Sequence, residues 1–139
     1  MTSSLLSFDH VHIISEEPDK SAQWYVDMLD ARMTSEQQVR GALQVGIELG
    51  GVTILIRGKR IGENPNLASP IQHFGDHSSH NEWGVDHFGF IYQGNLKKFC
   101  DEIRERGVTF AVEPIEFLPG TTICYVSAPD NVTIELIQK

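Results

Sequence analysis

The sequence has few cysteines, few basic residues and no long hydrophobic run. Cys100 and Cys124 are its two cysteines, and we expect both to be small buried hydrophobic side chains without a chemical role. No apolar run approaches the ~20 residues that a membrane span requires, which excludes a transmembrane protein. Eleven Lys and Arg stand against nineteen Asp and Glu, and the net charge of −8 has the wrong sign for binding a phosphate backbone. Nucleic acid is therefore not an expected partner.

The first residues also lack the pattern of a secretory signal. Residues 1–7 contain no basic n-region, no apolar h-region of useful length and no small-residue cleavage site, so we expect a cytoplasmic protein. Hydrophobic residues make up 40% and charged residues 22% of the 139 positions, close to the globular average. This length suffices for one core and is too short for two independent ones, which predicts a single domain over residues 1–139.

An internal repeat organises the chain. The pattern apolar-Asp-His-apolar occurs at residues 8–11 and again at 85–88, 77 residues later. The triplet Val-Thr-Ile occurs at 52–54 and again at 132–134, 80 residues later. Two echoes in the same order and at nearly the same offset indicate a duplicated unit.

Each half has the same predicted order of elements: a strand, a helix, and then two or three strands. Apolar spacing predicts helices around residues 22–29 and 96–103, with Asp19 and Asn95 as N-caps and Gly107 ending the second helix. The predicted strands are residues 8–14, 42–49, 52–57, 85–92, 108–112, 121–127 and 132–137.

This order divides the chain into modules at residues 8–57 and 84–138, joined by a long loop at 58–83. The loop is rich in Gly, Pro, Asn and Ser, and residues 70–74 within it could form one helical turn. It also carries His73, His77 and His80. Their spacing is compatible with a separate zinc site, although a polar loop or a lid is the favoured interpretation.

These residues carry a family resemblance. Tandem βαβββ units, each opening with a strand such as Phe8-Asp9-His10-Val11-His12-Ile13, resemble the vicinal oxygen chelate superfamily. That superfamily includes glyoxalase I, methylmalonyl-CoA epimerase, extradiol dioxygenases, fosfomycin resistance enzymes and metal-free bleomycin resistance proteins. The closing segment, residues 125–136, resembles the family's last strand pair. The resemblance implies an α+β fold in which the two modules form an open cup-shaped mixed β-sheet with flanking helices.

The resemblance also implies a metal site. By position, the ligands carried over are His10, His87 and Glu135. Alternate side chains of a strand lie on one face, so one His from each opening strand and one acid from the closing strand can converge. Two His and one carboxylate leave open positions on one divalent ion, which suits Fe(II), Mn(II), Ni(II), Co(II) or Zn(II). Substrate oxygens can fill those positions.

Two further positions bear on the chemistry. Leu55 stands at the first-module equivalent of Glu135, where glyoxalase I and the epimerase place a fourth ligand, so the resemblance favours a three-ligand site of the extradiol kind. Tyr125 occupies the place of the extradiol tyrosine that contacts substrate oxygens. The histidine expected upstream of that tyrosine is missing from residues 115–123, and Asn131 stands where Gly or Pro is expected. The missing histidine favours a lyase or isomerase instead.

His12 lies two residues after His10 and shares its face of the strand. It is a candidate general acid or base, and the alternative is a histidine hydrogen-bonded at the rim of the cup.

The function expected from these residues is a metal-dependent enzyme, dioxygenase-like or a lyase or isomerase, that chelates vicinal oxygens of a small organic substrate. Fosfomycin modification is disfavoured, because that group uses a cationic patch near the end of the chain and this sequence ends two residues after Ile137. The alternative is a metal-free protein of the bleomycin resistance kind that sequesters a small molecule. A homodimer is expected in either case.

Overall fold

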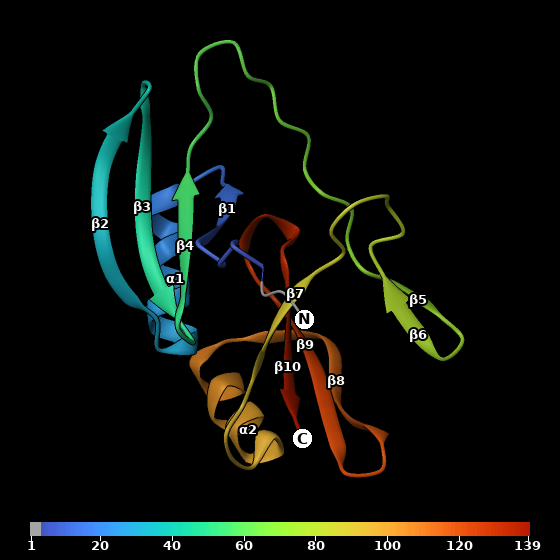
Figure 1. Cartoon of the computed structure of the whole chain (residues 1–139). Helices are drawn as coiled ribbons and strands as arrows, with labels where there is room; N and C mark the ends of the chain where they lie inside the picture. Colours follow the sequence, from blue (N-terminus) through green and yellow to red (C-terminus); the bar gives the residue numbers. More distant parts are fainter. Residues whose placement is uncertain (1–3) are drawn as a thin grey trace. The chain divides into compact units, whose positions relative to one another are not determined.

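The computed structural model describes residues 4–139 and divides the chain into two compact units, one ending at Asn64 and one starting at Pro65. Each unit contains one α-helix and one four-stranded sheet, whose paths can be followed in Figure 1. We describe each unit separately.

The first unit is a βαβββ module. Strand β1 is parallel to β4, and the remaining neighbours are antiparallel, so the sheet is mixed with the order β1-β4-β3-β2. The elements are β1 (His10–Ile14), α1 (Pro18–Leu29), β2 (Arg32–Val39), β3 (Ala42–Leu49) and β4 (Val52–Arg57).

The second unit contains the same module after a short hairpin. Its main sheet has the order β7-β10-β9-β8, again with the opening strand parallel to the closing one. The elements are β5 (Gln72–Phe74), β6 (His77–Ser79), β7 (Phe88–Ile91), α2 (Leu96–Arg106), β8 (Thr109–Leu118), β9 (Thr121–Ser127), the 3-10 turn η1 (Pro129–Asn131) and β10 (Thr133–Gln138). The predicted α+β class and the repeated βαβββ order are confirmed. That both units belong to one domain stays a prediction.

One face of each sheet is covered by its helix and buried. In both sheets every second side chain of a strand points into this core, as the two-residue period of a strand requires. The other face, which we call the helix-free face, is partly exposed. The core side chains of the first unit include Ile13, Ala22, Tyr25, Leu29, Val45, Ile47, Ile54 and Ile56, and those of the second include Leu96, Cys100, Ile103, Cys124, Val126, Ile134 and Leu136.

The two helices begin differently. Asn95 caps α2 as predicted, because its side chain accepts a hydrogen bond from the backbone N–H of Lys98 at 3.0 Å, and Gly107 ends the helix with φ 110°. The prediction for Asp19 was wrong. Glu17 occupies the N-cap position of α1 and Pro18 is the first helical residue, so Asp19 lies within the first turn. There its negative charge interacts favourably with the positive end of the helix dipole.

Strand β2 was not predicted. Its side chains are polar and almost all exposed, so the strand lacks the alternation that reveals a half-buried strand. It is an edge strand that pairs only with β3, through a tight turn at Arg40 and Gly41, both with positive φ. Strand β8 is longer than predicted and continues past Pro114, which an edge strand tolerates because one of its edges forms no ladder.

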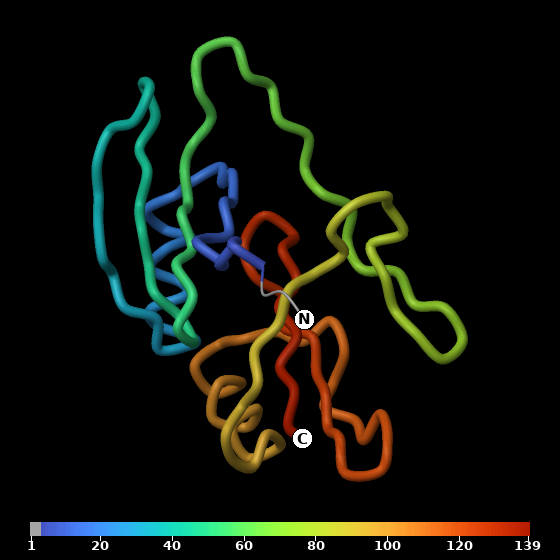
Figure 2. Tube along the Cα trace, viewed as in Figure 1, coloured from blue at the N-terminus to red at the C-terminus, as the bar shows by residue number. Residues whose placement is uncertain are grey.

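The segment at 58–83 contains a two-stranded hairpin, β5 and β6, which places a strand where a helical turn at 70–74 was considered. Figure 2 shows the extended path of the chain before this hairpin. Cys100 and Cys124 are free and buried, with their Sγ atoms 3.6 Å apart between α2 and β9, as expected of small core side chains. Over residues 4–139, no helix is long and apolar enough to cross a membrane.

Candidate functional site

The two modules have equivalent strand registers. In the first unit His12 on β1 pairs with Leu55 on β4, and in the second Gly89 on β7 pairs with Glu135 on β10. The registers therefore place Leu55 and Glu135 at equivalent positions, as the repeat in the sequence indicates. They also make Gly89 the counterpart of His12.

The second unit brings three of the predicted site residues together on its helix-free face. The Nε2 atom of His87 lies 3.5 Å from Oε1 of Glu135, and the ring of His87 lies 4.8 Å from the ring of Tyr125 between centroids. Glu135 and Tyr125 are direct neighbours across β10 and β9. Both His87 and Glu135 are about three-quarters buried or more, with side-chain exposures of 25% and 20%. An imidazole, a carboxylate and a phenol thus share one partly buried place.

An aspartate orients each repeat histidine. Nδ1 of His87 lies 2.7 Å from Oδ2 of Asp86, and Nδ1 of His10 lies 2.7 Å from Oδ2 of Asp9. A carboxylate accepts a hydrogen bond, so Nδ1 carries the proton and the lone pair of Nε2 is free in each neutral imidazole. Carboxylates hold metal-binding histidines in this way. The repetition of Asp9 and Asp86 directly before the two histidines was a signal for this role, which was not predicted from the sequence.

Asp86 is held in turn by the segment between β6 and β7. Its Oδ1 accepts hydrogen bonds from the Oγ of Ser79 at 2.9 Å and from the backbone N–H of His80 at 2.8 Å. Burial alone would raise the pKa of Asp86, but the hydrogen bonds with His87, His80 and Ser79 outweigh it and lower that pKa. Asp86 therefore stays ionised as the partner of His87.

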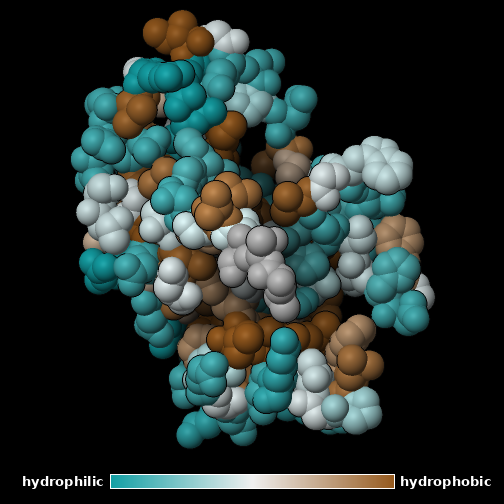
Figure 3. Space-filling model, in the orientation of Figure 1, coloured by the Kyte–Doolittle hydropathy of each residue, from teal (hydrophilic) through white to brown (hydrophobic). Residues whose placement is uncertain are grey.

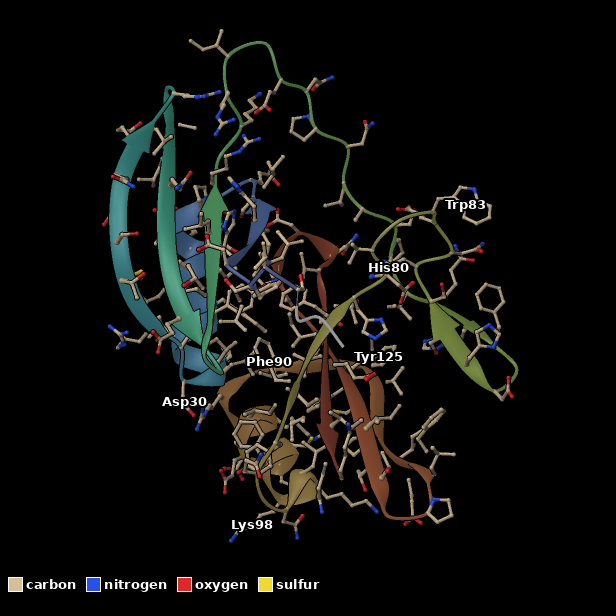
Figure 4. All side chains as sticks on the ribbon, viewed as in Figure 1. Asp30, His80, Trp83, Phe90, Lys98 and Tyr125 are labelled. Atoms are coloured by element: carbon tan, nitrogen blue, oxygen red, sulfur yellow. The ribbon has the colours of Figure 1, made fainter. Side chains whose placement is uncertain are left out.

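Tyr125 remains a neutral phenol. Burial raises the pKa of Tyr125, and the neighbouring negative charges of Glu135 and Asp86 raise it further. Figure 4 shows Tyr125 on the sheet of the second unit. At neutral pH its hydroxyl can donate a hydrogen bond to an oxygen of a bound molecule.

The first unit places His10 and His12 on the helix-free face of β1, with ring centroids 6.0 Å apart. Burial lowers the pKa of His12, and the nearby cation Arg57, with smaller contributions from His10 and Arg60, lowers it further. His12 is therefore neutral at pH 7 and can accept a proton.

Arg57 and Glu63 form a bidentate ion pair beside this histidine. The Arg57 guanidinium lies 2.7 Å and 3.1 Å from the two oxygens of Glu63, and the Arg60 backbone N–H also donates to Glu63. The hydrogen bond from Arg57, helped by the one from Arg60, lowers the pKa of Glu63 to about 2. The pair anchors the chain that leaves β4.

We expect the Glu63→Gln variant to be less stable than the unchanged protein at pH 7, and the difference to shrink on acidification. A carboxyl group whose pKa is lowered by folding stabilises the protein fully at pH values above its pKa in the unfolded chain, ~4.5. This stabilisation is lost as the pH falls toward about 2. Urea unfolding at pH 7 and pH 3 measures this. Glu105→Gln, on an exposed position of α2, is the control. A Glu63→Gln deficit that is the same at both pH values would contradict the assignment.

Gly89 is required opposite Glu135. A Cβ at position 89 would lie 2.8 Å from the backbone oxygen and 3.0 Å from the Cβ of Glu135. We therefore expect Gly89→Ala to push β7 from β10 and to lower the free energy of unfolding by about 1–3 kcal/mol. Gly75→Ala is the matched control, because a Cβ there meets nothing within 4 Å. Equal urea midpoints for the two variants would refute the predicted clash.

The three histidines of residues 58–83 are not members of the cluster of His87, Glu135 and Tyr125. His73 and His77 are exposed on the β5–β6 hairpin, whereas His80 is buried with both ring nitrogens bonded to Ser69 and Thr133. These three histidines therefore do not form the separate zinc site that was considered. No group of three His, Cys, Asp or Glu that could hold a metal occurs within either described unit. His10 lies in the first unit and the pair His87 and Glu135 in the second, so the three-ligand set stays a prediction.

The two βαβββ modules with their mixed sheets make this an α+β protein, the fold class that the family resemblance implies. The model of the Glyoxalase/Bleomycin resistance protein/Dioxygenase superfamily matches residues 7–136, and the chain belongs to that superfamily. Its members bind small molecules, commonly use divalent metal ions and often form dimers. The family resemblance predicted from the sequence is confirmed.

Solved structures show the same fold. A glyoxylase/bleomycin resistance protein/dioxygenase domain from Frankia sp. EAN1pec is 24% identical with a TM-score of 0.73, over 97% of this chain and 93% of that one. A glyoxalase family protein from Bacillus cereus is 14% identical with a TM-score of 0.75, over 98% and 95%. A fosfomycin resistance protein, FosX, from Listeria monocytogenes is 17% identical with a TM-score of 0.68, over 100% and 95%. A comparison with curated protein sequences gave no significant match.

Proposed function

We propose that this protein is a divalent-metal-dependent enzyme that binds a small organic substrate through two neighbouring oxygens, with His10, His87 and Glu135 as the metal ligands. The observation that carries the proposal is the chain of contacts from Asp86 through His87 to Glu135. It presents Nε2 of His87 and a carboxylate oxygen of Glu135 3.5 Å apart on the helix-free face. Asp9 and His10 repeat the same hydrogen bond in the first unit.

The donor set fits a metal of the kind expected. Two imidazoles and one carboxylate suit Fe(II), Mn(II), Ni(II), Co(II) or Zn(II) and leave positions for substrate oxygens. When bound, such an ion would supply Lewis-acid stabilisation of a developing enolate or catecholate, and a redox-active ion would also supply electrons to dioxygen. One chain or two could supply the three ligands.

The residues beside the ligands have complementary roles in the proposal. Tyr125, kept neutral by its surroundings, donates a hydrogen bond to a substrate oxygen and helps to orient it. His12, whose pKa is lowered, accepts the substrate proton at its free ring nitrogen. Leu55, opposite His12 on β4, cannot take that proton.

Two chemistries compete within this proposal. Three ligands and Tyr125 favour a dioxygenase, and the missing histidine in residues 115–123 favours a lyase or isomerase. If the protein is a dioxygenase, Fe(II)-loaded protein should consume oxygen with a panel of small catechols, and Zn(II)-loaded protein should not. An oxygen electrode measures this. No uptake by anaerobically reconstituted Fe(II) protein across the panel would remove the dioxygenase, and turnover of an α-hydroxycarbonyl or thioester substrate with Zn(II), Ni(II) or Co(II) would support the lyase or isomerase.

We also propose a cytoplasmic homodimer. Exposed apolar side chains on the edge strand β8, which are Ile115, Phe117 and Leu118, support a contact between copies. Figure 3 shows tan and brown atoms at its lower right, over the hairpin formed by β8 and β9. The alternative function is a metal-free binding protein that sequesters a small molecule. A purified protein that contains no metal would support this alternative.

A further inference from the structure

His80 is a buried histidine whose ring joins two distant parts of the second unit. Only 6% of the residue is exposed. Nδ1 bonds the backbone oxygen of Ser69, and Nε2 lies 2.9 Å from Oγ1 of Thr133. A carbonyl only accepts hydrogen bonds, so in the neutral ring Nδ1 donates to Ser69 and Nε2 accepts a hydrogen bond from the Thr133 hydroxyl. Figure 4 shows His80 on the segment between β6 and β7.

The backbone of the same residue holds the partner of His87. The N–H of His80 donates to Oδ1 of Asp86 at 2.8 Å, and the Oγ of Ser79 donates to the same oxygen at 2.9 Å. The other oxygen of Asp86 accepts from Nδ1 of His87 at 2.7 Å. A fixed position of His80 therefore fixes Asp86, and Asp86 fixes the tautomer and the ring plane of His87.

The side chain of His80 reaches the strand that carries the second ligand. Thr133 begins β10, lies two residues before Glu135 and so shares its face of the sheet. Thr133 is itself 4% exposed, so its hydroxyl and the ring of His80 are a buried polar pair that needs its mutual hydrogen bond. His80 thus links Asp86, which orients His87, to strand β10, which carries Glu135.

We propose that His80 is a positioning residue that sets how His87 and Glu135 face a bound divalent ion. The inference rests on the proposed function, because it assigns to His80 the support of the proposed ligands. His80 contacts neither ligand side chain through its ring, so it acts through Asp86 and Thr133. His73 and His77, the other histidines of this segment, have no such connection and serve as controls.

The first test uses the metal-free protein and the ring nitrogens of His87. Long-range ¹H–¹⁵N spectra distinguish a protonated Nδ1 from a protonated Nε2. We expect His87 in the unchanged protein to carry its proton on Nδ1 and His80→Ala to give a mixture of tautomers. Thr133→Val, which removes one hydroxyl and keeps the volume, should have the same effect in weaker form. His80→Gln should restore the Nδ1 tautomer, because its amide can donate to Ser69 and accept from Thr133.

The second test is titration with Co(II) alone, followed by visible absorption. We expect His80→Ala to weaken Co(II) binding by about 10-fold to 100-fold, the range of lost outer-shell contacts, and His77→Ala to leave it unchanged. Thr133→Val should fall near the lower end, and it covers the case in which His80→Ala does not fold.

The outcomes separate this inference from the proposed function. Suppose that the wild-type protein binds no Co(II), but the Nδ1 tautomer of His87 is lost in the His80→Ala variant. This result would exclude the metal site and would still support the positioning of His87 by His80. Binding by the wild type, with an unchanged His87 tautomer and unchanged Co(II) affinity in His80→Ala and Thr133→Val, would overturn the positioning role.

Discussion

Replacing Glu135 with alanine should weaken divalent metal binding by on the order of a hundredfold or more. Three or four ligands together contribute about 10–16 kcal/mol in structural zinc sites, so one ligand accounts for a few kcal/mol. Glu135 is 20% exposed and its Oε1 lies 3.5 Å from Nε2 of His87, so the substitution removes the carboxylate that faces this nitrogen. Isothermal titration with Co(II) or Zn(II) measures the change.

A series of variants makes this prediction specific. His87→Ala should match Glu135→Ala, and Asp86→Asn should lose about 10-fold to 100-fold because it disturbs only the orientation of His87. Glu116→Ala is the matched control, since Glu116 is an exposed carboxylate on β8 of the same sheet. Full metal affinity in Glu135→Ala would show that the ligand assignment is wrong.

If the protein is a lyase or isomerase, His12→Ala should lower turnover by about 10²–10⁴-fold at unchanged metal content. That is the usual contribution of a positioned acid or base. The lowered pKa of His12, caused by burial and by Arg57, keeps the imidazole ready to accept a proton at pH 7. Its neighbour across the strands is Leu55, which cannot replace it.

The comparison needs both kinetics and metal analysis, because His12 lies two residues from the proposed ligand His10. His73→Ala, an exposed histidine of the β5–β6 hairpin, controls for the loss of any imidazole. Turnover retained in a His12→Ala variant that still holds its metal would exclude His12 as the base.

Much of the fold could be predicted because its signals are local. Strands β3, β4 and β9 match the predicted bounds, since their alternating or apolar patterns and the turns beside them lie within short windows. Strand β2 could not be predicted from such a window, because its side chains are exposed and its strand state depends on pairing with β3.

The candidate site divides in the same way. His87, Glu135 and Tyr125 could be proposed together because the duplicated pattern and the family resemblance place them on one face, and the structure brings them together. The roles of Asp86 and His80 depend on hydrogen bonds across the unit, one of them to Thr133, 53 positions along the chain. No local pattern in the sequence indicates such a contact, so only a polar loop, a lid or a separate zinc site could be predicted for His80.

Elemental analysis of the purified, untagged protein tests the proposed metal site of His10, His87 and Glu135 most directly. A three-ligand site of two histidines and one glutamate should retain about one divalent ion per chain after gel filtration, and a strong chelator should remove it. Dialysis against a single metal should then restore the same ratio. A protein that holds no stoichiometric metal, as isolated or after reconstitution with each of Fe(II), Mn(II), Ni(II), Co(II) and Zn(II), would exclude the proposed metal site and support a metal-free binding protein.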